Sequence, residues 1–296
     1  MRFSSLAGIV ELCEAESSTI AALMIREQIQ ESGATEAEIR EQMTGYYRIM
    51  KEAVAKGLNE NTTSRSGLTG LDAQRVDEYM RVETPLLGGE AAKALAYALA
   101  VSEVNASMGR IIATPTAGSC GIIPGVFVSC QERFAWEDER MVEGLFAAGA
   151  IGYVIANNAF ISGAEGGCQA EVGSAVAMAA GALTELRGGS PAQAMHAVGL
   201  ALKNSLGLVC DPVGGLVEIP CIVRNGFGAV SAMTAADMAL AGVRSVIPSD
   251  EVVEVMLEVG QAMPETLRET ARGGLAQTPT GRRIMKELQA KRRREK

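Results

Sequence analysis

Small side chains dominate this chain and restrict how it can fold. Hydrophobic residues make up 48% of its 296 residues, but aromatic residues make up only 4%. The core must therefore be built from Ala, Val, Leu, Ile and the 14 Met, and 33 Gly accompany them. A chain of this length forms one large domain or two modest ones. Small side chains and frequent glycines together predict closely packed helices joined by tight turns.

Helix signals occur along most of the sequence. A capping box at 35–38 predicts a helix that ends at Gly57. Ser190-Pro191 predicts an N-cap followed by proline in the first turn, and Gly207 would close that helix. Further helices are expected at 89–108, at 137–156 and from 249 onward. Alternating β patterns are scarce, and 216–223 is the best extended stretch. The sequence thus predicts a mainly α, multi-helix single domain.

Three glycine-rich connections interrupt the predicted helices, at 62–70, 114–124 and 161–167. Loops of small polar residues and glycines expose backbone N–H groups, which can hold an anion such as a carboxylate. Each loop could equally be an ordinary turn. The second connection lacks the glycine spacing of a dinucleotide-binding fingerprint or of a P-loop, and no lysine follows its last glycine. The loops are therefore candidates for binding a small anion.

Three cysteines, Cys168, Cys210 and Cys221, lie among glycines, prolines or both. Such backbone can approach a bulky inorganic centre closely, and cysteine thiolates are the usual ligands of iron–sulfur clusters. Three thiolates would leave one iron open to a substrate. Alternatively, the cysteines are small buried hydrophobes. No C-x-x-C pair is present, so neither a zinc ribbon nor a thioredoxin motif is indicated.

The charge and hydropathy patterns argue against two classes of partner. The net charge is −8, from 27 basic and 35 acidic residues, which argues against a nucleic-acid surface. Basic residues gather at 291–296, where we expect a solvated, frayed tail. The longest apolar run, 145–156, is too short to span a bilayer. We therefore expect neither nucleic acid nor membrane as a partner.

The N-terminus and the cysteines together indicate a cellular compartment. No secretory signal peptide is visible, because residues 3–10 contain two serines and a glycine and acidic residues follow at once. Six cysteines without such a segment indicate a reducing environment, and so thiols or metal ligands rather than disulfides. The sequence therefore predicts a cytoplasmic protein.

The residues alone leave a catalytic base unassigned. His196 is the only histidine, and it lies within a predicted helix, where a lone histidine is more often structural than catalytic. Glu165 and Glu171 flank Cys168 and could lie next to a bound group, but two carboxylates six positions apart have no diagnostic value. Cys120 lies inside the second glycine-rich connection and is a further candidate residue of that loop.

Several segments together resemble the α chain of iron–sulfur-dependent L-serine dehydratase, over nearly the whole chain. The specific ones are the two cysteine segments, 162–173 and 207–221. Segments 66–70, 114–118 and 272–276 are also similar to the family, but they are glycine-rich and carry less weight.

This resemblance implies a mainly helical catalytic domain at 1–288, followed by the basic tail at 289–296. It implies one [4Fe–4S] cluster bound by Cys168, Cys210 and Cys221, with glycine-rich loops that line the site and bind the substrate. The substrate-binding residues expected in these loops are Ser66, Gly67, Thr116, Ala117, Gly118, Ser119 and Cys120. The family's α half is either fused to a β half or made as a separate chain. This sequence has room only for the α half, so a separate β chain is implied.

The activity implied by the resemblance is that of an L-serine ammonia-lyase in amino-acid catabolism and gluconeogenesis. Serine would lose water and then ammonia to give pyruvate. An open iron would polarise the hydroxyl as a Lewis acid, and a base must take the α-proton. We expect the β chain to supply that base or to position it, with His196 as the alternative. Two rival functions stay open, a related [4Fe–4S] L-cysteine desulfidase and a non-catalytic helical interaction subunit.

Overall fold

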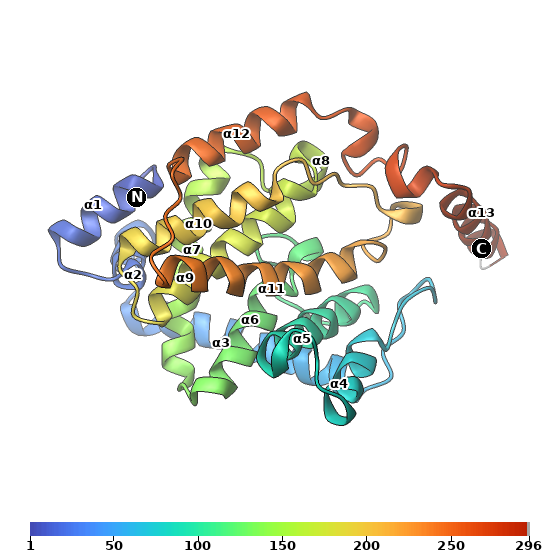
Figure 1. Ribbon diagram of the computed structural model, residues 1–296, viewed down its shortest axis with the longest axis horizontal. Helices are drawn as coiled ribbons and strands as arrows, with labels where there is room; N and C mark the ends of the chain where they lie inside the picture. The colour runs from blue at the N-terminus through green and yellow to red at the C-terminus, as the bar shows by residue number, and fades with distance from the viewer. Residues whose placement is uncertain (295–296) are drawn as a thin grey trace.

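The computed structural model describes residues 1–294, which form one mainly helical domain (Figure 1). Its α-helices are α1 (Leu6–Ala15), α2 (Ile20–Ser32), α3 (Glu36–Asn59), α4 (Asp72–Val82), α5 (Gly88–Ala106), α6 (Ile122–Phe134), α7 (Asp138–Asn158), α8 (Gly163–Gly166), α9 (Ser174–Leu186), α10 (Pro191–Ser205), α11 (Cys221–Leu240), α12 (Ser249–Ala262) and α13 (Pro279–Arg294). Short 3-10 turns are η1 (Ala117–Ser119), η3 (Val213–Gly215), η4 (Glu265–Leu267) and η5 (Gly274–Gln277), and η2 (Gln169–Gly173) is a π-helical turn. The prediction of a mainly α single domain is confirmed.

Extended structure is almost absent from residues 1–294. It consists of two isolated bridges, Thr63–Gly70 and Cys210–Arg268, and no strand. Within the same residues, no helix is both long enough and apolar enough to cross a membrane.

Side-chain caps explain where several helices begin. At the start of α3, the Thr35 hydroxyl accepts a hydrogen bond from the Glu38 N–H, and the Glu38 carboxylate accepts one from the Thr35 N–H at 2.8 Å. Ser190 and Gln193 form a second capping box at the start of α10, whose first residue is a proline. Each box satisfies N–H groups that have no partner inside the helix. These predicted starts, and the start of α12 at Ser249, are confirmed.

Two local predictions are wrong. Gly57 does not end α3 but lies inside it, because α5 packs directly against this position. A Cβ on Gly57 would lie 2.4 Å from the Ala100 carbonyl oxygen. The stretch 216–223 forms no strand either: residues 217–220 turn and lead directly into α11. Gly57 is therefore explained by the close contact between α3 and α5. Residues 216–223 have no neighbouring strand with which to pair among the described residues.

The core is built around α5, α9 and α11. Helix α5 packs on α3, α4, α6 and α11, while α9 packs on α7, α10 and α11. Every residue of α9 except Glu185 is buried, as expected for a helix enclosed by others. Gly125 of α6 repeats the role of Gly57, because a Cβ there would lie 2.8 Å from the Ala98 nitrogen. Small residues thus let neighbouring helix backbones approach closely.

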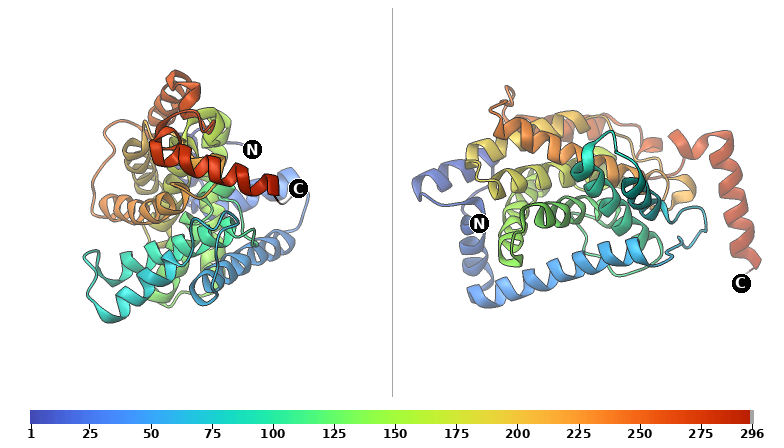
Figure 2. Two further views of the ribbon diagram at one scale, coloured as in Figure 1. Left: turned by 90° about the vertical axis from the view of Figure 1, so that its right-hand side faces the viewer. Right: turned by 60° about the horizontal axis from the view of Figure 1, so that its bottom comes forward.

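Helix α13 projects from the end of the molecule (Figures 1 and 2). It packs against the short turns η3 and η5. The basic tail expected at 289–296 begins inside this helix. Its described part is helical up to Arg294 and not frayed, whereas residues 295 and 296 lie outside the described residues.

The contact at Gly57 predicts opposite effects for the same substitution at two positions of α3. Gly57→Ala should destabilise the protein by about 1–3 kcal/mol, because its methyl group overlaps the α5 backbone. Gly45→Ala is the matched control, since no atom outside the helix lies within 4 Å of the new Cβ. It should stabilise by roughly 0.5–1 kcal/mol, the usual gain for alanine over glycine inside a helix. Urea unfolding of both variants measures the difference, and equal effects would contradict the close contact.

Candidate active site

The three predicted cluster ligands come from separate segments and lie in one region. Cys168 precedes the π-helical turn η2, Cys210 follows α10, and Cys221 is the first residue of α11. Their exposed fractions are only 1%, 3% and 6%. The thiols of Cys168 and Cys210 lie close enough for each to shift the pKa of the other. Burial raises the pKa of the Cys221 thiol, and the neighbouring charge of Cys168 raises it further.

Arg224 is the cation of this region. Its guanidinium donates to the Val209 carbonyl oxygen at 2.7 Å and to Asp211 Oδ1 at 3.0 Å, and the charge of Cys168 raises its pKa. The Cys210 thiol and the Arg224 guanidinium together hold the pKa of Cys168 below its usual value. A thiolate is the form of cysteine that binds metals and acts as a nucleophile. Arg224 therefore favours the chemically competent form of Cys168.

The chain after α12 closes over Cys210. The Cys210 N–H donates to the Leu267 carbonyl oxygen at 2.8 Å. The second oxygen of Asp211 accepts from the Leu275 N–H at 2.8 Å. Gly274 makes this contact possible, because its φ is +57° and a Cβ would lie 2.4 Å from Asp211 Oδ2. The glycine-rich segment 272–276 thus holds Asp211, and through it Arg224.

A buried asparagine joins the second glycine-rich loop to α11. Asn225 is 1% exposed, and its side-chain N–H₂ donates to the Gly118 carbonyl oxygen at 2.7 Å and to the Cys221 carbonyl oxygen at 2.8 Å. Its side-chain oxygen accepts from the Gly121 N–H at 2.8 Å. All its main hydrogen-bonding groups are satisfied, so the loop is held firmly against the first turn of α11.

Glu171 supplies a buried carboxyl group on the other side of this loop. It is 8% exposed, and the Thr116 hydroxyl donates to its Oε1. The backbone of Gly118 lies against the same carboxylate, since a Cβ on Gly118 would lie 2.4 Å from Oε1. Burial raises the pKa of Glu171, although Thr116 and Gly118 oppose the shift. Its charge acts on all three cysteine thiols, so it belongs to the same region.

The first glycine-rich loop docks on the segment between Cys210 and Cys221. The Ser66 hydroxyl donates to Glu218 Oε2, and the Thr69 hydroxyl donates to the same oxygen at 3.3 Å. Glu218 itself is buried. The first and second glycine-rich loops therefore both contact segments that carry a cysteine.

The remaining predicted substrate-binding residues differ in accessibility. Gly67 and Ala117 are exposed, whereas Ser119 is buried and donates to the Thr114 carbonyl oxygen at 3.0 Å. Cys120 is fully buried within the hydrophobic core, and burial raises the pKa of its thiol to about 12. Because its thiol is enclosed and inert, Cys120 packs the loop against the core and does not contact a substrate.

The other two candidates, His196 and Glu165, lie outside the cysteine region. His196 is half-buried on α10, and its pKa is lowered by burial and by the charges of Arg244 and Lys203. Glu165 is exposed and accepts a hydrogen bond from the Ser162 hydroxyl at 2.7 Å. Neither residue shares a described contact with the three cysteines.

Sequence reasoning named Glu171 as a possible neighbour of a bound group without giving it a role, and it did not single out Asn225. Glu171 lies three residues after Cys168, and Asn225 lies four residues after Cys221. Each polar side chain is therefore about one helical turn beyond a cysteine, on the same face. That spacing is the signal that could have found Asn225 and distinguished Glu171 from Glu165.

The donor set fits a thiolate-bound cluster better than a single ion. Within residues 1–294, no three His, Cys, Asp or Glu side chains converge on one ion position. An iron–sulfur cluster takes its thiolates on separate iron atoms, so its ligands need not converge. The backbone is also shaped to the thiols, because a Cβ on Gly163 would lie 2.7 Å from the Cys210 sulfur.

Comparison with known proteins identifies the family. Residues 15–276 match the family model of the serine dehydratase alpha chain. A probable L-serine dehydratase alpha chain of Bacillus subtilis is 50% identical over 97% of this chain and 95% of its own. The L-serine dehydratase alpha chain of Peptoniphilus asaccharolyticus is 44% identical over 95% and 96%. The chain belongs to the serine dehydratase alpha chain family.

A longer relative shows a different chain organisation. L-serine dehydratase TdcG of Escherichia coli is 39% identical over 93% of this chain, but the match covers only 61% of TdcG. TdcG therefore contains a large part that has no counterpart in the chain described here.

Proposed function

We propose that this chain is the α subunit of an L-serine ammonia-lyase, which converts L-serine to pyruvate and ammonia. One observation supports the proposal above the others. Three buried cysteines lie in the same region as the buried carboxyl group of Glu171 and the glycine-rich loop at 114–124. The names of the relatives from B. subtilis and P. asaccharolyticus support the same substrate. Six free cysteines suit the reducing conditions of the cytoplasm.

The cofactor in this proposal is one [4Fe–4S] cluster held by Cys168, Cys210 and Cys221. When bound, such a cluster with three protein ligands supplies an open iron that acts as a Lewis acid toward the serine hydroxyl. Arg224 favours the thiolate form of Cys168 and is itself held by Asp211. The protein's part is to favour the thiolate of Cys168 and to keep all three thiols dry and fixed in position.

We assign the general base to Glu171 of this chain. Its carboxylate accepts the proton from Cα of serine and returns this proton to the departing hydroxyl, which leaves as water. Burial raises the pKa of Glu171 above that of an ordinary glutamate, which strengthens it as a base near neutral pH. Thr116 and Gly118 orient the carboxylate. The aminoacrylate that leaves the site tautomerises and is hydrolysed to pyruvate and ammonia.

This assignment changes the origin of the base. The sequence alone directed attention to a β chain or to His196, whereas Glu171 lies within reach of the cysteine region. Backbone N–H groups of the Thr116–Ser119 loop are the proposed partners of the substrate carboxylate, because such groups favour an anion in a site from which water is excluded.

A partner chain remains part of the proposal. The match to TdcG covers 61% of that protein, and the match to an L-serine dehydratase of Streptomyces coelicolor covers 59%. A separate β chain would correspond to the part of these proteins that this chain does not match. Its role here is to complete and stabilise the enzyme, while the base stays on the α chain.

The cofactor proposal is tested by replacing cysteines one at a time under anaerobic conditions. Cys168→Ser, Cys210→Ser and Cys221→Ser should each lose bound iron, bound sulfide, the broad visible absorption and pyruvate formation together. Cys13→Ser and Cys130→Ser are the controls and should retain all four. Retention of four irons per chain and full turnover by Cys210→Ser would refute the ligand assignment.

Rates with two substrates separate the alternative functions in the same preparation. A serine dehydratase forms pyruvate from L-serine faster than from L-cysteine, and a cysteine desulfidase shows the reverse order. A chain with no iron and no turnover, alone or with a β chain, would be the non-catalytic subunit.

The base assignment predicts the behaviour of two glutamate variants in the α/β complex. Glu171→Gln should lower kcat by about 10²–10⁴-fold with the visible spectrum unchanged, because the amide cannot accept the α-proton. Glu165→Gln is the matched control, since Glu165 is exposed, and it should keep wild-type kcat. If the β chain supplied the base, Glu171→Gln would retain full kcat in the complex.

A further inference from the structure

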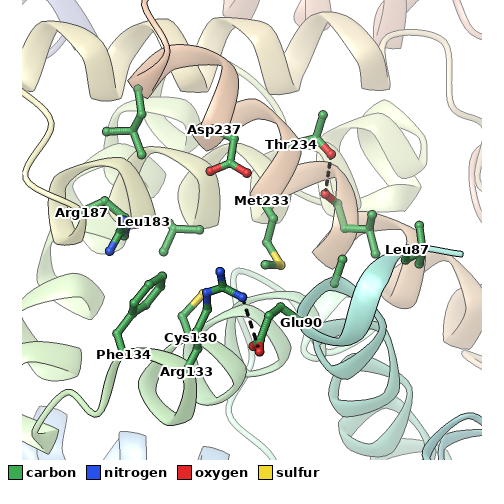
Figure 3. A pocket seen from close by; sticks show the side chains of 13 residues that line it. Leu87, Glu90, Cys130, Arg133, Phe134, Leu183, Arg187, Met233, Thr234 and Asp237 are labelled. Atoms are coloured by element: carbon green, nitrogen blue, oxygen red, sulfur yellow. Dashed lines mark hydrogen bonds and ion pairs between the residues drawn. The ribbon is translucent and has the colours of Figure 1, made fainter. Parts of the chain in front are cut away.

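A second candidate site is a pocket at the C-terminal ends of α6 and α9, whereas the candidate active site lies near the N-terminal ends of these helices. The second and third glycine-rich loops precede α6 and α9. The pocket instead meets the last turns of α6 and α9, together with the start of α5 and the second half of α11 (Figure 3). Its volume is about 340 Å³, which is within the range of small-molecule sites.

The inner wall of this pocket is apolar. Cys130 and Leu183 are almost fully buried, and Met233 reaches into the space from α11 (Figure 3). Val230 and Leu240 complete this wall. Such a wall suits a short apolar side chain of a ligand.

Charged groups of both signs surround the apolar wall. Figure 3 shows the Arg133 guanidinium and the Asp237 carboxylate on opposite sides of the opening. Within residues 1–294, Arg133 pairs with Glu90 Oε1 at 3.4 Å, while Asp237 and Arg187 take part in no ion pair. The second oxygen of Glu90 is buried and has no hydrogen-bond partner among the same residues. Because this oxygen has almost no accessible surface, Asp237, which is exposed, is the carboxylate that a ligand can reach.

The two arginines are held by an aromatic ring. The Arg187 guanidinium carbon lies 4.0 Å from the centre of the Phe134 ring, and that of Arg133 lies at 5.3 Å. Phe134 in turn stacks on Trp136, with ring centres 4.8 Å apart. Cation–π contacts of this kind restrict the guanidinium groups while leaving their N–H donors available.

Arginines near helix C-termini also neutralise the helix dipole, which gives Arg133 and Arg187 a role without a ligand. That role does not explain the facing Asp237 carboxylate or the cavity between it and the arginines. A ligand that carries both a carboxylate and an ammonium group satisfies all of these features at once.

We propose that this pocket binds a free α-amino acid with an apolar side chain. Its carboxylate lies at Arg133 and Arg187, its ammonium group lies at Asp237, and its side chain packs against Cys130 and Leu183. This site is separate from the cysteine region and goes beyond the proposed activity.

Calorimetric titration of the complete chain with L-leucine tests the proposal. L-leucine should bind saturably, while isocaproate, which lacks the ammonium group, and isopentylamine, which lacks the carboxylate, should bind at least about tenfold more weakly. Equal heats from all three compounds, or no binding of L-leucine, would overturn it.

Two pocket variants assign the charged contacts. Asp237→Asn should weaken L-leucine by about tenfold or more and leave isocaproate unchanged, and Arg187→Met should weaken both. Glu254→Gln is the matched control, because Glu254 is exposed on α12, outside the pocket, and removes the same charge. Unchanged L-leucine binding in both pocket variants would refute the site.

A final variant distinguishes this pocket from the candidate active site, which could itself hold an amino acid. Thr116→Val removes the hydroxyl that contacts Glu171 and should leave L-leucine affinity unchanged. Loss of binding in Thr116→Val, with full binding in Asp237→Asn, would place the ligand in the candidate active site and disprove the second pocket.

Discussion

The close approach of helix backbones at glycine is the contact on which the rest of this structure depends. Gly57 and Gly125 let α3 and α6 approach α5 at Ala100 and Ala98, where any larger residue would overlap the backbone. With few aromatic rings, the core gains its packing density from many short contacts between small residues. Since α6 and α11 both pack on α5, the loops that precede them are brought to the same end of the core.

Polar contacts then hold the loops and the cysteine segments together at this end of the core. Asn225 fastens the second glycine-rich loop to α11, and Asp211 fastens Arg224 beside Cys168. These buried groups satisfy one another, which allows charged and polar atoms to exist in a dry region. Glu171 is the exception, because its carboxyl group is only partly compensated and its pKa is raised. Perturbed groups of this kind are typical of positions that do chemistry.

Local signals in the sequence predicted local structure well. The capping boxes at Thr35 and Ser190 depend on residues within one turn, so the helix starts followed from the sequence. The mainly helical fold class was likewise predicted correctly, while the role of the three cysteines as cluster ligands stays a prediction. The role of Gly57 and the burial of Glu171 depend on contacts with α5 and with the loop at Thr116. Such long-range contacts leave no periodic pattern in the sequence, so they required the structure.

The pairing of Cys210 with the segment that follows α12 has a consequence for how the protein matures. The Cys210 N–H donates to the Leu267 carbonyl oxygen, and the neighbouring Asp211 carboxylate accepts from the Leu275 N–H. The walls around the thiols therefore include residues that follow the cysteines in the chain. During synthesis, the cysteines emerge long before these walls do. The enclosure around the three thiols can therefore form only after translation has passed Leu275, and no inorganic group can be enclosed there earlier.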